Sequence, residues 1–208
     1  EYLIRNNAVE EGKKLPFEEY IVNFIIDSIN DQIETMMWQG DTTLTDDKTR
    51  KWINGFIKIA KGEDDVIDVA IASTKTAYEA ITDVYMAIPE KVLEMSPEIY
   101  VSPALFRKFV QEMVQMNFYH FPVGAPVGEF VLPGTDVKVV KTKGLAGTRS
   151  VLATFPQNLF YACDMEDDNE DIDLWYSKDD RVFKLEVLFN SGVEIAYPDM
   201  VVLGEIAA

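Results

Sequence analysis

The residues of this chain that could carry chemistry are few, and they do not form a recognisable catalytic set. His120 is the only histidine, so a catalytic Ser/His/Asp or Cys/His arrangement would have to use it. Its neighbours Tyr119 and Phe121 are aromatic, which favours a structural role within a loop. Cys163 is the single cysteine, so no intrachain disulfide and no cysteine-based zinc site can form. It ends an apolar run without a basic neighbour, and we expect it to be a buried small side chain rather than a nucleophile.

Two charged segments are candidates for binding. The acidic run 164–173, DMEDDNEDID, concentrates the oxygen ligands that calcium prefers, but it lacks the spacing and the turn glycine of an EF-hand loop. We interpret it as a solvated loop or as a patch that meets a basic neighbour. The segment 141–149, KTKGLAGTR, carries Lys141, Lys143 and Arg149 but is not the phosphate-binding GxxxxGK[ST] motif. We expect it to be an exposed basic loop that meets an acidic surface on another subunit, and we predict no catalytic residue, no metal and no cofactor.

Composition limits the possible partners. The chain has 208 residues, of which 48% are hydrophobic and 12% aromatic, as in folded globular proteins. Its net charge of −17 argues against a general binder of nucleic acid or anionic membranes, because both would be repelled. No apolar run approaches the length of a membrane span.

The element that must organise the rest is a long helix predicted from Pro16 to Gly40. Proline suits the first helical turn and glycine a helix end. Its charged positions are all acidic, with no Lys or Arg, and include Glu18, Asp27, Asp31 and Glu34. Apolar residues recur at helical spacing and form one face, in which we also include Ser28. The members of this face are Phe17, Tyr20, Ile21, Phe24, Ile25, Ser28, Ile29, Ile33, Met36 and Met37.

The middle of the chain alternates between helix and strand patterns. After a polar surface connection, a core pattern is predicted from Trp52 to Ile59. Strands are predicted over 66–72, 97–101, 137–140, 150–154 and 159–163, and helices over 77–88 and 103–116 with a short piece at 90–95. N-cap candidates lie at 73–76 and at Ser102.

From residue 174 onward the period changes to two, which predicts an antiparallel meander through 201–203. Since its apolar face needs a partner, we expect it to pack on the long helix. The prediction is therefore an α+β chain with two domains. One consists of 1–51 plus 166–208 and the other, an inserted α/β domain, of 52–165.

The order of these parts resembles the major capsid protein of tailed phages, the Hong Kong 97-type fold that encapsulin shells share. Four blocks carry the resemblance: IETMMWQGD (33–41), WINGFIKIA (52–60), YMAIPEKVLE (85–94) and IYVSPALFRKFVQEM (99–113). The longest block is 132–204, which begins LPGTDVKVVKTKGLAGTRSVLATFPQNLFYACDMEDDNEDIDLWYSKDD. In that family a long spine helix and a sheet form a peripheral domain, with an axial domain inserted between them.

The resemblance implies a structural subunit, of phage or prophage origin, that assembles into pentamers and hexamers of an icosahedral shell. Its partners would be other subunits, with packaged nucleic acid touched only indirectly and no membrane. The implied location is the virion capsid, assembled in the host bacterial cytoplasm. Residues 124–134 or 141–149 would lie near contacts between subunits. The acidic back of the long helix would meet basic loops of neighbours, which makes Glu18, Asp27, Asp31, Glu34, Lys141, Lys143 and Arg149 candidate inter-subunit contacts.

The family also has an N-terminal arm and an extended hairpin loop ahead of its spine helix, and the 15 residues before Pro16 are too few for both. We therefore expect this chain to be a fragment that is monomeric or weakly associating by itself. Two alternatives stay open: an encapsulin-like compartment shell, and a small α/β enzyme whose pocket gathers His120 with carboxylates.

Overall fold

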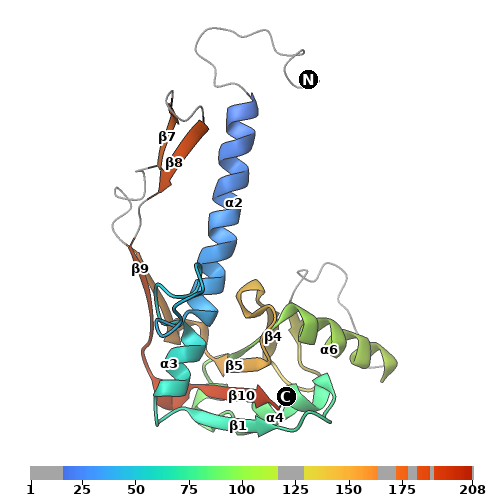
Figure 1. Ribbon diagram of the computed structural model, residues 1–208. Helices are drawn as coiled ribbons and strands as arrows, with labels where there is room; N and C mark the ends of the chain where they lie inside the picture. Colours follow the sequence, from blue (N-terminus) through green and yellow to red (C-terminus); the bar gives the residue numbers. More distant parts are fainter. Residues whose placement is uncertain (1–15, 117–128, 164–171, 178–181, 188–189, 208) are drawn as a thin grey trace.

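The computed structural model describes residues 16–116, 129–163, 172–177, 182–187 and 190–207 (Figure 1). Its helices are α2 (Pro16–Gln39), α3 (Phe56–Gly62), α4 (Ala77–Ala87), α5 (Glu90–Leu93) and α6 (Pro103–Gln115). Three short 3-10 helices are η1 (Lys143–Leu145), η2 (Pro156–Asn158) and η4 (Pro198–Met200). The strands are β1 (Ile67–Ile71), β2 (Glu98–Val101), β3 (Glu129–Val131), β4 (Lys138–Lys141), β5 (Ser150–Thr154), β6 (Leu159–Cys163), β7 (Ile172–Ser177), β8 (Val182–Val187), β9 (Ser191–Ile195) and β10 (Val202–Ile206).

Six strands form a mixed sheet in the order β1-β10-β5-β2-β4-β3. The pairs β1–β10 and β2–β4 are parallel, whereas β10–β5, β2–β5 and β3–β4 are antiparallel. The remaining strands form two ribbons, β6 with β9 and β7 with β8, both antiparallel. The predicted α+β class is confirmed. The predicted continuous meander is wrong, because β8 pairs with β7, β9 pairs with β6, and β10 joins β1 and β5 in the larger sheet.

Helices cover both faces of this sheet, and the alternation of side chains assigns each residue to one face. In the central strand β5, Val151 and Ala153 belong to a core with α4 and α6, while Leu152 belongs to a second core with α3 and the end of α2. β5 is buried along its whole length, which explains why its sequence is apolar without a polar period. The two-domain division stays a prediction, although β10 from the predicted outer domain lies inside the sheet built mostly from 52–165.

The long helix is confirmed as α2, which has 24 residues and is about 36 Å long at ~1.5 Å per residue. Figure 1 shows it rising away from the six-stranded sheet, with its C-terminal end nearest to that sheet and the β7–β8 ribbon drawn at the level of its N-terminal half. It packs on η1 and α3, and its Trp38 joins a core cluster with Ile195 and Leu203. The expected burial of the whole apolar face is therefore wrong. Phe24 is 66% exposed, because the sheet lies beyond the last turns of the helix rather than alongside it.

Local capping rules place the helices of the sheet layer as predicted. Thr76 forms a capping box with Glu79 at the start of α4, and Ser102 accepts the Leu105 N–H at the start of α6. The Glu112 carboxylate from α6 accepts two further N–H groups at the start of α4, those of residues 77 and 78, at 3.1 and 2.7 Å. The two helices are thereby joined by hydrogen bonds as well as by apolar contact.

One predicted core residue lies on the surface. Trp52 is 67% exposed and its indole N–H donates to the Lys48 carbonyl, whereas Phe56 and Ile57 are buried as expected. Trp52 belongs to the turn-rich segment before α3, so it lies outside the helix that carries Phe56 and Ile57 into the core.

Candidate assembly surface

The basic loop and the acidic side of the long helix, predicted separately, meet within this one chain. Lys143 Nζ lies 3.1 Å from Asp31 Oδ1, and the Gly144 N–H donates to Glu34 Oε1 at 3.0 Å. From the last turn of α2, Gln39 Nε2 donates to the Gly144 carbonyl oxygen at 2.6 Å. We call this contact between α2 and η1 the spine–loop junction.

A glycine makes this close approach possible. A Cβ atom at residue 144 would lie 2.5 Å from the carbonyl oxygen of Glu34 and closer still to the ring of Trp38. Trp38 is in turn buried against Phe56 and Tyr100, with ring centroids 5.3 and 5.1 Å away. The junction thus connects the backbone of the loop, the long helix and the sheet through one aromatic cluster. The pKa of Tyr100 is raised, mainly because burial disfavours its charged form.

The charges at the junction orient the loop more than they stabilise it. The hydrogen bond from Lys143 to Asp31 raises the pKa of the lysine, and the nearby carboxylates of Glu34 and Asp27 add to the effect. Both members of the Lys143–Asp31 pair are well exposed, and ion pairs between exposed side chains contribute little to stability because water and salt screen them. The close packing at Gly144 therefore does more than the ion pair to hold the loop.

The other predicted contact residues are spread over the surface. Asp27 is exposed on α2, Lys141 is half-buried at the end of β4, and Arg149 is exposed before β5. Arg149 donates to the Ala207 carbonyl oxygen at 3.3 Å. Glu18 lies in α2, in a stretch whose side chains the structure does not describe. Whether any of these residues contacts a neighbouring subunit stays a prediction.

Of the residues singled out for chemistry, the structure describes Cys163 but not His120. Cys163 is exposed, not buried as predicted, because it ends β6 in a two-stranded ribbon that does not belong to the main sheet. His120 and residues 164–171 of the acidic run lie outside the described residues. Within the described ranges, no group of three or more His, Cys, Asp or Glu side chains is placed to hold a metal ion. In the same ranges, no helix has the length and apolar character needed to cross a bilayer.

Sequence reasoning missed an ordered turn between α2 and α3. Asp41 accepts hydrogen bonds from the hydroxyl and the N–H of Thr43, and these lower its pKa to about 2. Asp47 accepts from the N–H groups of Thr49 and Arg50 and from the Arg50 guanidinium, which also lowers its pKa to about 2. Aspartates that precede threonine in a polar segment were a usable signal for such turns.

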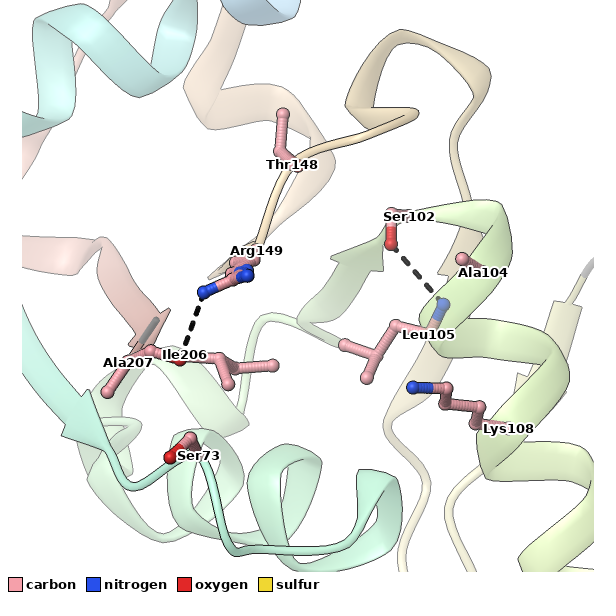
Figure 2. Close-up of a pocket in the computed structure, with 9 residues that line it drawn as sticks. All are labelled: Ser73, Ser102, Ala104, Leu105, Lys108, Thr148, Arg149, Ile206 and Ala207. Atoms are coloured by element: carbon pink, nitrogen blue, oxygen red, sulfur yellow. Dashed lines mark hydrogen bonds between the residues drawn. The ribbon is translucent and has the colours of Figure 1, made fainter.

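The described residues also form a pocket of about 300 Å³ at one end of the six-stranded sheet. Figure 2 shows its lining side chains, which come from the segment after β1, the first turns of α6, the residues before β5 and the end of β10. Lys108 and Arg149 supply its positive charge, Ser73 a hydroxyl, and Leu105 and Ile206 an apolar side. Such a lining suits an anionic group, since it holds no carboxylate.

Solved structures of similar fold identify the architecture. A chain in the structure of the satellite phage P4 procapsid, which includes the size determination (Sid) protein, matches with a TM-score of 0.63 and 10% identity. The match covers 94% of this chain and 69% of that one. The capsid of an empty GTA particle matches with a TM-score of 0.54 and 12% identity over 95% of this chain and 69% of that chain. The chain has a phage capsid fold.

No protein-family model and no curated protein matches the sequence. The structural match nevertheless extends over nearly the whole chain. The predicted fold class is thus confirmed by comparison as well as by the elements themselves. Because the identities are 10 and 12%, the likeness concerns the fold alone.

Proposed function

We propose that this chain is a structural subunit of an icosahedral phage-type shell, in which it assembles into pentamers and hexamers. The observation that carries the proposal is the likeness to two capsid structures over 94 and 95% of the chain. The finer assignment, a Hong Kong 97-type major capsid protein of phage or prophage origin, belongs to the same proposal. It rests on the resemblance of the sequence blocks named above.

The exposed apolar side chains of the isolated chain support a role in assembly. Phe24 on α2 and Phe160 on the β6–β9 ribbon are 66 and 54% exposed, although both are large aromatic residues. Aromatic side chains are enriched at the centres of protein interfaces, where they bury a large area. Both lie on elements that depart from the main sheet, where copies of the chain could cover them.

The proposed partners are other copies of the subunit, and packaged nucleic acid would be touched only indirectly because the net charge is −17. The proposed location is the virion capsid, with assembly in the host bacterial cytoplasm and no role for a membrane. We propose no catalytic activity. Contacts between subunits would use Asp27, Lys141, Arg149 and Glu18, together with the spine–loop junction.

Sedimentation and negative-stain electron microscopy over a concentration series test this proposal. We expect a monomer or weak associations at micromolar concentration, because like-charged chains repel one another, and ring-like or closed particles at higher concentration. A chain that stays monomeric throughout the series, with no ring or shell in the micrographs, would contradict the proposal.

A further inference from the structure

The cationic pocket has no anion to balance it in the described part of the chain. Neither Lys108 nor Arg149 forms an ion pair with a described acidic residue, whereas Lys58, Lys61 and Lys75 each do. The chain has 36 acidic and only 19 basic residues. Two cations that share one pocket and form no ion pair with a described acidic residue are therefore notable in a protein with so many carboxylates.

The geometry of the pocket suits a carboxylate side chain. Figure 2 shows Lys108 extending its amino group from α6 into the pocket, across from Arg149, whose guanidinium already donates to the Ala207 carbonyl oxygen. The guanidinium has five N–H donors, so further donors stay available for a carboxylate. Ser73 adds a hydroxyl, and Leu105 and Ile206 offer apolar contact for the methylene groups of an Asp or Glu side chain.

A complementary acidic turn lies at the opposite end of the same strand. Glu63, Asp64 and Asp65 are all exposed and lie one residue before β1, while the pocket begins after β1 at Ser73. No described residue pairs with their carboxylates. β1 has five residues, which span about 16 Å at ~3.3 Å per residue. The turn therefore cannot fill the pocket of its own chain.

We infer that the pocket receives the acidic turn 63–65 of a second copy of this chain. The contact joins two different surfaces head to tail, and a head-to-tail contact that repeats with a closing rotation generates a ring. Complementary charge at the two ends of β1 would set the register between neighbours and speed their encounter. This inference rests on the proposed shell function and names one contact within the proposed rings.

Zero-length cross-linking tests the contact directly. Chains labelled with ¹⁴N and ¹⁵N are mixed at about 1 mM, where weak contacts are populated, and treated with a carbodiimide, which joins a lysine amine to a touching carboxylate. We expect mixed-isotope peptides that link Lys108 to Asp64 or Asp65. Lys108→Arg keeps the positive charge but removes the amine, so it should abolish this cross-link while the sedimentation profile stays the same.

A charge exchange provides the second measurement. Lys108→Glu alone, or Asp64→Lys with Asp65→Lys, should weaken self-association about tenfold, because each places like charges opposite one another. Mixing the two variants should restore self-association, while Lys91→Glu, at an exposed position of α5, should have little effect. If particles form but no cross-linked peptide contains Lys108, or if mixing the two variants does not restore self-association, this contact is refuted while the shell proposal stands. If sedimentation and microscopy show no association at all, both fail.

Discussion

The spine–loop junction makes a quantitative prediction for Gly144→Ala. The added methyl group would lie 2.5 Å from the Glu34 carbonyl oxygen and closer to the Trp38 ring. Neither can move freely, because the first is helix backbone and the second is buried. Overpacking of this kind destabilises by about 1–3 kcal/mol.

Displacement of the loop would also weaken two hydrogen bonds of Gly144, one to the Glu34 carboxylate and one from the Gln39 amide. A typical net contribution is about 1 kcal/mol per hydrogen bond, and more where one partner is charged. We therefore expect a loss of about 3 kcal/mol in the free energy of unfolding, with the midpoint of thermal unfolding lowered by about 6–12 °C for a chain of this size.

Urea unfolding followed by tryptophan fluorescence measures this change, since Trp38 lies in the junction. The matched control is Gly62→Ala in α3, where an added Cβ would meet nothing within 4 Å. There alanine should be neutral or stabilising by up to about 1 kcal/mol, because it favours the helix and restricts the unfolded chain. If Gly144→Ala were as stable as the control, the close approach of loop and helix would be refuted.

Three further predictions concern the buried network, the helix face and pH. Asn158→Ala should destabilise the fold by about 3 kcal/mol in urea unfolding. The fully buried amide bridges the segments before β6 and after β9, and its loss leaves several groups unpaired. A change below 1 kcal/mol would contradict this. Phe24→Asp should change the stability of the isolated chain by less than about 0.5 kcal/mol, because the ring is exposed; cooperative unfolding at much lower urea would show that the ring is buried. The pKa values of Asp41 and Asp47 are depressed to about 2, so their contribution to folding stability is present above pH 3.8 and is lost as pH falls through 2. NMR titration of the two carboxyl groups should give these pKa values. Replacing both residues by Asn should reduce the loss of stability between pH 4 and 2.

Local rules explain why many elements were predictable. Pro16, Gly40 and the helical spacing between them are sufficient to place α2, since helix limits depend on residues within one turn. The same holds for Ser102 and Thr76, whose side chains cap the helices that follow them. The candidates Asp31, Glu34 and Lys143 were also chosen by charge alone, but the predicted partner of Lys143 was another subunit. The structure pairs Lys143 with Asp31 of the same chain.

Contacts between distant segments required the tertiary structure. Composition and periodicity are local properties, and they were sufficient to predict an acidic α+β chain with a long, one-sided helix. The exposure of Phe24 and the burial of Trp38 could not be predicted in this way, since they depend on where the sheet ends along the helix. Nor could the pairing of β10 with β1 and β5 rather than with β9, because an alternating pattern determines which side chains face the core but not which strand lies beside it.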